Sequence, residues 1–548
     1  MSKHAGDLIK DILLASKVDR IWGITGDSAN FITEAVCKSS IRFVHVRHEE
    51  TAGFACGGEA LMKDELSVCI GSCGPGALHL INGLYDANRN GAPVLCLATH
   101  IPKDEIGTQY VQETDPMKLF ADCSVFCEYA QSVEQLPRIM GIAMQTAVAR
   151  KGVAVIIIPG DVSSKTLASE AKEQKYVPHY CCPVIKPVEA EIKQLADILN
   201  AATKITIIGG QGCRYARSEV KELSRILKAP LGWSYRSKEY LDHNNPLAIG
   251  CVGKLGNNSV DEAIEKCEVL LLLGVGNAGG HIYNTNAKII QVDVNGSAIG
   301  RRHWIDYGYK GEVQDTIYEL LSHLKEKFDT TFAKEVCQCY KDKQQQYAIN
   351  SEKKTNEEGK IMPEYLISLI DKKAPFNTCF CADTGTPLIL MERYISSGDK
   401  RRFFHSAEYG SIGNALPTAM GVRSATVDRK VIALCGDGGL SMLLGDLLTV
   451  VQEKFDVKMI VFNNATYDLA AMNTMVRGKT PINTALTSTD FAKVATSLGI
   501  RARRVEQVEE LEQALDELLN STEAYLLDVR VAAVSELHQC LLNKNKNL

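Results

Sequence analysis

The sequence lacks any apolar run long enough to cross a membrane. No stretch of its 548 residues approaches the roughly 18 to 20 uncharged apolar residues that span a bilayer. Residues 1–18 alternate charged and apolar residues at helical spacing, without the continuous apolar core or small-residue cleavage site of a signal peptide. We therefore expect a cytoplasmic protein without membrane association.

The sequence also lacks an excess of basic residues and any cysteine pair in CxxC spacing. Its 61 basic and 66 acidic residues are mixed along the chain and give a formal net charge of −5, so no basic stripe predicts a nucleic-acid partner. Many of the 18 cysteines, such as Cys69, Cys96 and Cys435, lie inside apolar runs. We expect free thiols in a reducing compartment, not a zinc or disulfide site.

No long disordered region is expected, because 45% hydrophobic and 23% charged residues is ordinary globular composition. Apolar strand-like runs ending in glycine or polar residues alternate with helical segments, the pattern of parallel sheets covered on both faces. The sequence predicts an α/β protein with three doubly wound parallel-sheet domains, at residues 1–180, 186–330 and 360–535. A proline-containing linker near 177–187 and a lysine- and glutamate-rich helical connector at 326–361 would separate them. Similar patterns in the first and third units indicate related sheets.

Residues 431–469 are the most informative segment. Residues 431–434 read as a buried strand, and three glycines, Gly436, Gly438 and Gly439, let the following turn approach a ligand. Asp437 lies on that turn. We expect Ser441 to cap a helix whose positive end favours a phosphate oxygen.

A second strand at residues 458–462 delivers Asn463 and Asn464 at its carboxyl end. Because parallel strands end at the same sheet edge, Asp437 and Asn464 should emerge side by side, where their oxygens can build an octahedral magnesium site. Taken singly, each feature has a simpler interpretation: a Gly-Asp-Gly turn is common, and Asn-Asn after a strand is often only a turn.

Together, these features resemble the signature of thiamine-diphosphate enzymes. The resemblance implies that Asp437, Asn464 and the carbonyl of Thr466 bind Mg²⁺. It also implies further cofactor contacts from Asp383, Gly385, Thr386, Gly436, Gly438, Gly439, Tyr467 and Leu469.

Residues 46–60, VRHEETAGFACGGEA, contain a candidate activating carboxylate at a strand-to-helix junction. Thiamine chemistry needs a carbanion at C2 of the thiazolium, formed with the help of a carboxylate on the aminopyrimidine ring. Glu49 aligns with that residue in the family. Alternatively, Glu49 and Glu50 are both first-turn acids that complement the helix dipole, and we assign only Glu50 to this role.

Residues 408–421, EYGSIGNALPTAMG, resemble the family segment in which an aliphatic side chain bends the cofactor. Ile412 occupies that position, and Gly410 and Ser411 would flank the pyrimidine. Without the other motifs, Ile412 would be assigned to the hydrophobic core.

The first 165 residues are similar to the quinone-dependent pyruvate oxidases of bacteria, notably in RIWGITGDS, RHEE and GSCGPGALHLINGLYDANRN, and the similarity continues to about residue 532. It implies pyrimidine-binding, central FAD-type and diphosphate-binding domains. It also implies a dimer or tetramer in which Glu49 faces Asp437 of another subunit.

The resemblance implies FAD in the middle domain, with contacts from Gly253, Gly274, Asn277 and Asp293. Asp293 would end a buried strand, as an acid that reaches a nucleotide ribose often does. Three departures stand against a full match. The loop at 274–280 lacks the family's proline and aromatic residues, Leu469 replaces a phenylalanine, and the chain stops at SELHQCLLNKNKNL without a lipid-binding tail. We therefore expect no membrane activation.

The leading hypothesis is oxidative decarboxylation of pyruvate or a similar small 2-oxo acid, with electrons passing to FAD. The alternative is a non-oxidative decarboxylase or acetolactate-type carboligase with a vestigial or absent flavin. A third interpretation is a catalytically silent paralogue, which intact Glu49, Asp437 and Asn464 oppose. Val111 and residues 467–475 are predicted to line the substrate pocket, but the 2-oxo acid, the electron acceptor and the acyl acceptor stay open.

Overall fold

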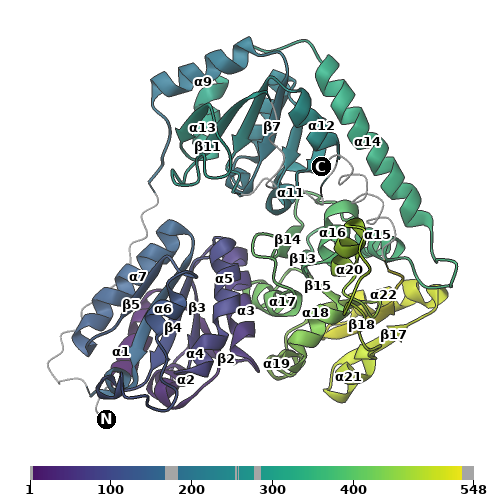
Figure 1. Cartoon of the computed structure of the whole chain (residues 1–548). Helices are drawn as coiled ribbons and strands as arrows, with labels where there is room; N and C mark the ends of the chain where they lie inside the picture. Colours follow the sequence, from purple (N-terminus) through teal and green to yellow (C-terminus); the bar gives the residue numbers. More distant parts are fainter. Residues whose placement is uncertain (1–3, 167–182, 254–255, 257, 277–285, 534–548) are drawn as a thin grey trace.

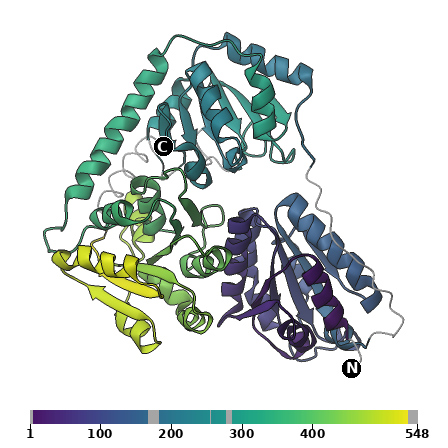
Figure 2. The ribbon, with the colours of Figure 1, turned by 180° about the vertical axis from the view of Figure 1, so that it is seen from behind.

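The computed structural model describes residues 4–166, 183–253, 256, 258–276 and 286–533, and these form three α/β domains (Figure 1). The N-terminal, middle and C-terminal domains lie at the corners of a triangle, which Figure 2 shows from behind. The predicted fold class is confirmed.

The N-terminal domain is a parallel sheet with helices on both faces. Within residues 4–166 its strands are β1 (Arg20–Gly23), β2 (Arg42–His45), β3 (Ser67–Gly71), β4 (Val94–His100), β5 (Phe126–Tyr129) and β6 (Val153–Pro159). Its helices are α1 (Ala5–Ala15), α2 (Asn30–Cys37), α3 (Glu49–Lys63), α4 (Pro75–His79), α5 (Ile81–Arg89), α6 (Pro116–Phe120), α7 (Leu136–Arg150) and α8 (Gly160–Ser164), with 3₁₀ turns η1 (Asp27–Ala29), η2 (Lys103–Glu105) and η3 (Val133–Gln135). Central strands β4 and β6 are buried along their whole length, because helices cover both faces.

The middle domain has the same layered construction. Its described strands are β7 (Ile205–Gly209), β8 (Leu231–Trp233), β9 (Ala248–Cys251), β10 (Val269–Leu273), β11 (Lys288–Asp293) and β12 (Tyr307–Lys310). Its helices are α9 (Glu189–Ala201), α10 (Arg217–Leu227), α11 (Lys238–Leu241), α12 (Asn258–Lys266) and α13 (Val313–Leu321), with η4 (Gln211–Cys213) and η5 (Tyr235–Ser237). The helix α14 (Thr331–Glu352) then runs along the outside of the molecule to the C-terminal domain (Figure 1), as expected for the charged connector.

The C-terminal domain contains the third parallel sheet. Its described strands are β13 (Cys379–Ala382), β14 (Arg402–His405), β15 (Val431–Gly436), β16 (Val457–Asn463), β17 (Arg501–Val505) and β18 (Tyr525–Arg530). Its helices are α15 (Pro363–Lys373), α16 (Thr386–Tyr394), α17 (Ala415–Ala425), α18 (Asp437–Met442), α19 (Leu447–Glu453), α20 (Asp468–Val476), α21 (Phe491–Ser497) and α22 (Leu511–Asn520), with η6 (Leu444–Asp446) and η7 (Val508–Glu510).

The first and third sheets share one strand order. The first runs β2-β1-β3-β4-β6-β5 and the third runs β14-β13-β15-β16-β18-β17, so each strand of one has a counterpart in the other. The middle sheet runs β12-β11-β10-β7-β8-β9, the order typical of dinucleotide-binding domains. In all three, the order reverses between two central strands, and ligands of such sheets bind at that switch point.

The N- and C-terminal domains share one continuous apolar core. It includes Trp22 and Cys96 from the first sheet and Val431 and Val461 from the third. Helix α3 crosses α17 at very short range, because a Cβ atom on Gly421 would lie 1.9 Å from the carbonyl oxygen of Ala55. Two parts of the chain far apart in sequence therefore meet as one packed unit, visible in the centre of Figure 1.

The middle domain contacts the C-terminal domain through polar side chains. Glu239 of α11 accepts hydrogen bonds of 3.1 Å from the guanidinium of Arg402, and His405 Nε2 lies 3.3 Å from the carbonyl oxygen of Tyr235. Both interactions attach α11 and the preceding turn to β14. The middle domain is therefore anchored on the strand that leads to the segment before α17.

Among the described residues, no helix is long and apolar enough to cross a membrane. The cysteines described there are all free thiols, and most are buried.

Candidate active site

The site predicted from residues 431–469 lies at the switch point of the third sheet. Asp383 follows β13 and Asp437 follows β15, the two adjacent strands between which the strand order reverses. Both strands end at the same sheet edge because they are parallel. The fold therefore presents the two carboxyl groups at the place where doubly wound sheets bind ligands.

Asp383 connects three segments of the chain at this sheet edge by hydrogen bonds, namely its own turn, the start of α17 and the end of β15. Its Oδ1 accepts a 3.0 Å hydrogen bond from the Ala415 amide at the start of α17, and its Oδ2 accepts one of 3.1 Å from Gly436. A Cβ atom on Gly439 would lie 2.2 Å from Oδ2, so only glycine fits there. Burial raises the pKa of Asp383 to about 6, against the effect of its backbone donors.

Asp437 binds the turn that follows β16. Its Oδ2 accepts a 2.6 Å hydrogen bond from the amide of Ala465, and Asn464 Oδ1 accepts one of 3.1 Å from the amide of Thr466. Burial raises the pKa of Asp437, with hydrogen bonds from Gly438 and Ala465 opposing it. Asp437 is thus hydrogen-bonded to the turn that contains the other two predicted metal ligands, Asn464 and Thr466.

This donor set fits Mg²⁺ chemically. One carboxylate, one amide oxygen and one backbone carbonyl are the hard oxygen ligands that magnesium takes alongside phosphate oxygens. No cluster of three or more His, Cys, Asp or Glu side chains suited to a metal ion occurs among the described residues, so nothing in that part of the chain forms a zinc-type site.

The two asparagines after β16 have different partners. Asn463 is buried and its amide nitrogen donates to Asp528 at 2.8 Å and to the carbonyl of Thr489 at 2.9 Å. Its oxygen accepts from Arg530. Asn463 therefore fixes the end of the strand, which leaves Asn464 as the side chain at the site edge.

The prediction that Ser441 caps a helix is wrong. The first helix after the turn, α18, begins at Asp437 with Gly436 as its N-cap, and Ser441 lies inside it, donating a 2.7 Å hydrogen bond to the carbonyl of Gly438. The continuous helix expected here is also divided into α18, η6 and α19. The glycines allow the helix to start five residues earlier than a cap at Ser441 would predict.

Tyr467 and Leu469 lie at the start of α20, beside the turn. A Cβ on Gly438 would meet the Tyr467 ring at 2.4 Å, so this ring packs directly on the glycine turn. Leu469 is partly buried against Ile389 and Met472 in a small apolar cluster. These two residues therefore lie next to the glycine turn that contains Asp437.

Gly385 and Thr386 lie at the start of α16, next to α20. Gly385 is the N-cap of α16 with a φ of 131°. The hydroxyl of Thr386 donates to Asp468 Oδ2 at 3.4 Å, which joins α16 to α20.

Glu49 is the first residue of α3 and is 7% exposed. Its Oε2 lies 2.9 Å from His79 Nδ1, and the ring of His79 stacks on His48 with centroids 4.5 Å apart. Glu50 belongs to the same first turn, and its amide donates to His48 Nδ1 at 3.3 Å. The Glu50 carboxylate accepts a hydrogen bond from Asn82, so only Glu49 is turned toward His79.

Asn82 joins the N-terminal half of the site to the C-terminal half. Its amide nitrogen donates to Glu50 at 2.5 Å and to the hydroxyl of Ser411 at 3.0 Å. Ser411 and Gly410 are held from behind by Ser406, and Ile412 follows directly. Ile412 is only partly buried and belongs to none of the apolar cores formed by the described residues, which favours a ligand-facing role.

The N- and C-terminal domains of one chain contact each other through the α3–α17 crossing and the hydrogen bond from Asn82 to Ser411. That Glu49 of one subunit faces Asp437 of another stays a prediction.

His79, Asn82 and Asp446 were not identified from the sequence. His79 and Asn82 lie in the GPGALHLIN stretch after β3, and only the position of that stretch at a strand end could have indicated them. Asp446 lies nine residues after Asp437 and accepts hydrogen bonds from Arg47 and Thr51 across the domain contact.

The predicted substrate residue Val111 is 76% exposed in the loop after η2. The neighbouring Gln112 accepts a hydrogen bond from the thiol of Cys73 at 3.1 Å. This contact places the loop over the glycine-rich turn that precedes His79.

The predicted flavin residues that the structure describes lie at the carboxyl ends of strands of the middle sheet, and Gly274 lies at its switch point between β10 and β7. Gly274 follows β10 and packs against Gly212 after β7, since a Cβ on Gly274 would lie 2.5 Å from the Gly212 Cα. Asp293 ends β11, accepts from the Asn295 amide at 2.8 Å and has its pKa raised by burial. Gly253 follows β9, and Asn277 lies outside the described residues. The residues described fit a dinucleotide site in position.

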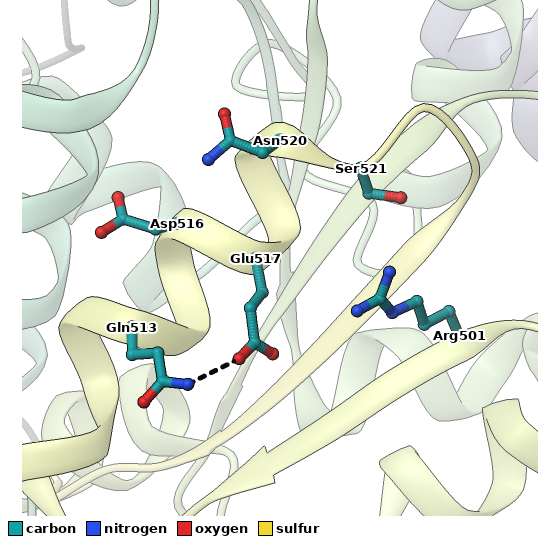
Figure 3. Close-up of a pocket in the computed structure, with 6 residues that line it drawn as sticks. All are labelled: Arg501, Gln513, Asp516, Glu517, Asn520 and Ser521. Atoms are coloured by element: carbon teal, nitrogen blue, oxygen red, sulfur yellow. Dashed lines mark hydrogen bonds between the residues drawn. The ribbon is translucent and has the colours of Figure 1, made fainter.

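A cavity of about 540 Å³ lies elsewhere, between α22 and β17 (Figure 3). Its lining residues are Arg501, Gln513, Asp516, Glu517, Asn520 and Ser521. Arg501 is the first residue of β17, so the cavity is at the amino edge of the sheet, opposite the candidate site. Glu517 pairs with Arg503, and Asp516 pairs with Lys373. These two carboxylates are therefore not free to bind a ligand.

Comparison with known proteins identifies the class that this fold and site define. Thiamine pyrophosphate enzymes match in three parts: their N-terminal TPP binding domain at residues 3–119, their central domain at 192–320 and their C-terminal TPP binding domain at 383–529. The chain belongs to this family.

Among its relatives is the putative thiamine pyrophosphate-containing protein YdaP of Bacillus subtilis, 30% identical over 536 residues, covering 96% of this chain and 92% of that protein. The pyruvate oxidase of Lactiplantibacillus plantarum is 27% identical over 520 residues, covering 94% and 86%. A probable acetolactate synthase large subunit of Methanococcus aeolicus is 28% identical over 555 residues, covering 96% and 91%. The protein is a thiamine-diphosphate-dependent enzyme of the pyruvate oxidase and acetolactate synthase group.

Proposed function

We propose that the enzyme decarboxylates pyruvate or a similarly small 2-oxo acid oxidatively and passes the electrons to FAD. The observation that carries the decarboxylation is the sheet edge where Asp383 binds the start of α17 and Asp437 binds the turn that contains Asn464. The proposed transfer of electrons to FAD is supported by the strand order of the middle sheet, which is typical of dinucleotide-binding domains.

Mg²⁺ would be held by Asp437, Asn464 and the carbonyl of Thr466, and the diphosphate by the turn at Gly436–Gly439 and the segment Asp383–Thr386. When bound, thiamine diphosphate supplies a nucleophilic carbon that attacks the 2-oxo group and accepts electrons as carbon dioxide leaves.

The proposed roles of the chain's own residues are to position the cofactor and to exchange a proton with it. Glu49 is proposed to share a proton with the aminopyrimidine ring, and its burial beside His79 holds the carboxylate in one orientation. Ile412 is proposed to support the bent cofactor, while Gly410 and Ser411 flank the pyrimidine. Tyr467 and Leu469 would exclude water from the thiazolium side.

The alternative is a non-oxidative decarboxylase or carboligase. Leu469 favours it, because this side chain packs into an aliphatic cluster with Ile389 and Met472 and offers no aromatic ring toward a flavin. The similarity to an acetolactate synthase is as extensive as that to a pyruvate oxidase.

The visible spectrum of the purified protein, recorded before and after anaerobic addition of pyruvate with thiamine diphosphate and Mg²⁺, decides between the two. A flavin band that bleaches supports oxidation. Carbon dioxide release without a flavin band, or with a flavin that stays oxidised, supports the alternative.

We also propose self-association as a dimer or tetramer in which the N-terminal domain of one subunit serves the C-terminal domain of another. Glu49→Gln and Asp437→Ala each disable one half of the site. If two subunits share sites, mixing and refolding the two inactive variants restores part of the activity, since mixed dimers contain one intact pair. No recovery in a mixed oligomer means that each chain builds its own site.

A further inference from the structure

The turn after β16, which contains two of the predicted metal ligands, pairs with a short segment that follows α20. The Tyr467 amide donates a 2.8 Å hydrogen bond to the Thr484 carbonyl. The Leu486 amide donates one of 2.8 Å to the Ala465 carbonyl. Because the two stretches run in opposite directions, these bonds form a short antiparallel ladder. We call residues 484–486 the pairing segment.

The register of this ladder decides where the backbone groups of Thr466 point. Thr466 and Ala485 lie opposite each other as a non-hydrogen-bonded pair, because the residues on either side of them make the two hydrogen bonds. In such a pair, the N–H and C=O groups of each residue point away from the other strand. The Thr466 amide accordingly donates to Asn464 Oδ1 at 3.1 Å. The Thr466 carbonyl, proposed as the third metal ligand, is therefore on the side of Asn464 and outside the ladder.

Side chains hold the pairing segment in this register at two points. The Thr466 hydroxyl donates a 3.0 Å hydrogen bond to the Thr484 carbonyl. Further along the chain, the Thr489 carbonyl accepts a 2.9 Å hydrogen bond from Asn463 at the end of β16. The ladder thus fixes the direction of the Thr466 carbonyl as well as its position.

Ala465 connects the pairing segment to Asp437. Its amide donates a 2.6 Å hydrogen bond to Asp437 Oδ2, and its carbonyl accepts the hydrogen bond from Leu486. Its φ of 57° lies in the left-handed region, which residues other than glycine rarely adopt. Such a conformation persists only where the surrounding contacts hold it. Here one contact comes from a proposed metal ligand and the other from the pairing segment.

The Leu486 side chain also packs on the glycine turn that contains Asp437. A Cβ atom on Gly438 would lie 3.1 Å from Leu486 Cδ1, beside the ring of Tyr467. The backbone of Leu486 therefore binds the turn after β16, while its side chain contacts the turn after β15. One residue that follows α20 thus touches both turns that supply the proposed metal ligands.

We infer that Leu486 is a positioning residue, which together with the pairing segment orients the ligands of the proposed metal site and so sets the affinity for the metal. This inference rests on the proposed function, in which Asp437, Asn464 and the Thr466 carbonyl bind Mg²⁺. Mg²⁺ demands near-ideal octahedral geometry, so its binding is sensitive to small displacements of its ligands. Groups that orient metal ligands typically contribute about 10- to 100-fold to metal affinity.

Proline substitutions test the register directly, because proline has no amide hydrogen. Leu486→Pro removes the hydrogen bond to Ala465. Ala485→Pro is the matched control at the neighbouring position, where the amide points away from the ladder. Leu486→Ala keeps the backbone hydrogen bond and removes the packing on Gly438. Its control is Ile482→Ala, at a side chain that is 77% exposed in the same loop.

The metal probe is Mn²⁺, which takes the same kinds of oxygen ligand as Mg²⁺ and is followed by electron paramagnetic resonance. A titration with Mn²⁺ at a fixed concentration of thiamine diphosphate gives the half-saturating metal concentration and the number of sites. Amide hydrogen exchange of a peptide covering residues 463–470, measured without cofactor, reports whether the ladder is lost.

Leu486→Pro and Leu486→Ala are expected to raise the half-saturating Mn²⁺ concentration by about 10- to 100-fold, with the number of sites unchanged. Leu486→Pro should also speed amide exchange in the peptide. Ala485→Pro and Ile482→Ala should match the wild type in both measurements. A loss of folding would instead reduce the number of sites. If either proline variant does not fold, the comparison of Leu486→Ala with Ile482→Ala tests the same inference.

An unchanged half-saturating concentration in the folded Leu486 variants would overturn the inference and leave the proposed function intact. An equal increase in Ala485→Pro and Leu486→Pro would also overturn it, because the effect would then not depend on the register of the ladder. A wild-type protein that binds no Mn²⁺ in the presence of thiamine diphosphate would instead contradict the proposed function, and the inference would fail with it.

Discussion

Asn82 and Ser411 are joined by a 3.0 Å hydrogen bond between side chains 329 residues apart in the sequence. Asn82 also donates to Glu50, so a single amide connects the first turn of α3 with the segment that leads into α17. The hydrogen bonds of Asn82 thus link the first turn of α3, which contains Glu49, to the segment that contains Ser411 and Ile412.

Replacement of Glu49 by Gln should abolish turnover while leaving cofactor binding largely intact. The amide keeps the shape of the side chain but cannot share a proton with the aminopyrimidine, and loss of such catalysis costs about 100- to 10,000-fold. Steady-state kinetics together with a thiamine diphosphate titration checks this. Glu50→Gln is the neighbouring control and should retain most activity; retained turnover in Glu49→Gln would remove Glu49 from the proposed role.

Chelation of the metal should lower both cofactor affinity and thermal stability. A ligand bound only to the folded state stabilises it by about 2.7 kcal/mol at 100 times its dissociation constant. Thiamine diphosphate with Mg²⁺ should therefore raise the thermal midpoint, EDTA should reverse the increase, and Asp437→Ala should prevent it. The exposed Asp104 supplies the control variant Asp104→Asn, which should respond like the wild type.

Substitution of Gly421 by Ala should disrupt the crossing of α3 and α17. The new methyl group would meet the Ala55 carbonyl oxygen at 1.9 Å, and overpacking of this kind costs about 1 to 3 kcal/mol. A lower thermal midpoint and weaker cofactor binding are expected. In Gly296→Ala the nearest atom to the added Cβ is the side chain of Lys310 at 3.6 Å, so that variant should be neutral. Equal behaviour of the two variants would argue against a tight crossing.

Glu392 on α16 should make the protein less stable as the pH rises. Burial, and next the charges of Asp242 and Glu239, raise its pKa from 4.5 to about 8, while Lys238 opposes the increase. Below pH 4.5 the carboxyl is protonated in both states and contributes nothing. Between pH 4.5 and 8 only the unfolded state releases the proton, so stability falls; above pH 8 the loss is constant.

Glu392→Gln removes this titration. Each pH unit between the two pKa values corresponds to about 1.4 kcal/mol, so the variant should melt at a higher temperature than the wild type at pH 9 and at a similar one at pH 5. Thermal midpoints measured across that range check the prediction. If the thermal midpoints of the two proteins change with pH in parallel, Glu392 is not the source of the pH dependence of stability.

The parts of the site that are local in sequence were predictable. The Gly-Asp-Gly turn after β15 and the asparagines after β16 follow from buried strands that must end at one edge, so the proximity of Asp437 and Asn464 could be expected before any coordinates. The first residue of α18 could not be predicted, because glycine and serine both occur as N-caps. Only the backbone conformation shows that Gly436, and not Ser441, is the N-cap.

The partners across the domain contact could not be predicted. Asn82, His79 and Asp446 belong to residue types that usually face solvent, and their partners lie 30 to 399 residues away. Their roles depend on how α3 and α17 pack, which is a property of two complete domains. No short segment of the sequence contains that information.

The shared strand order of the first and third sheets means that the N- and C-terminal domains are two versions of one α/β unit within a single chain. Ala55 contacts Gly421 and Gly58 contacts Thr418, and the same offset of 363 residues carries Ala55 onto Thr418 and Gly58 onto Gly421. The crossing is therefore isologous, as in a symmetric dimer. That offset also carries Glu49 onto Ile412. The residue proposed to activate the cofactor and the residue proposed to bend it thus occupy equivalent positions in two domains that share one strand order and meet at one interface.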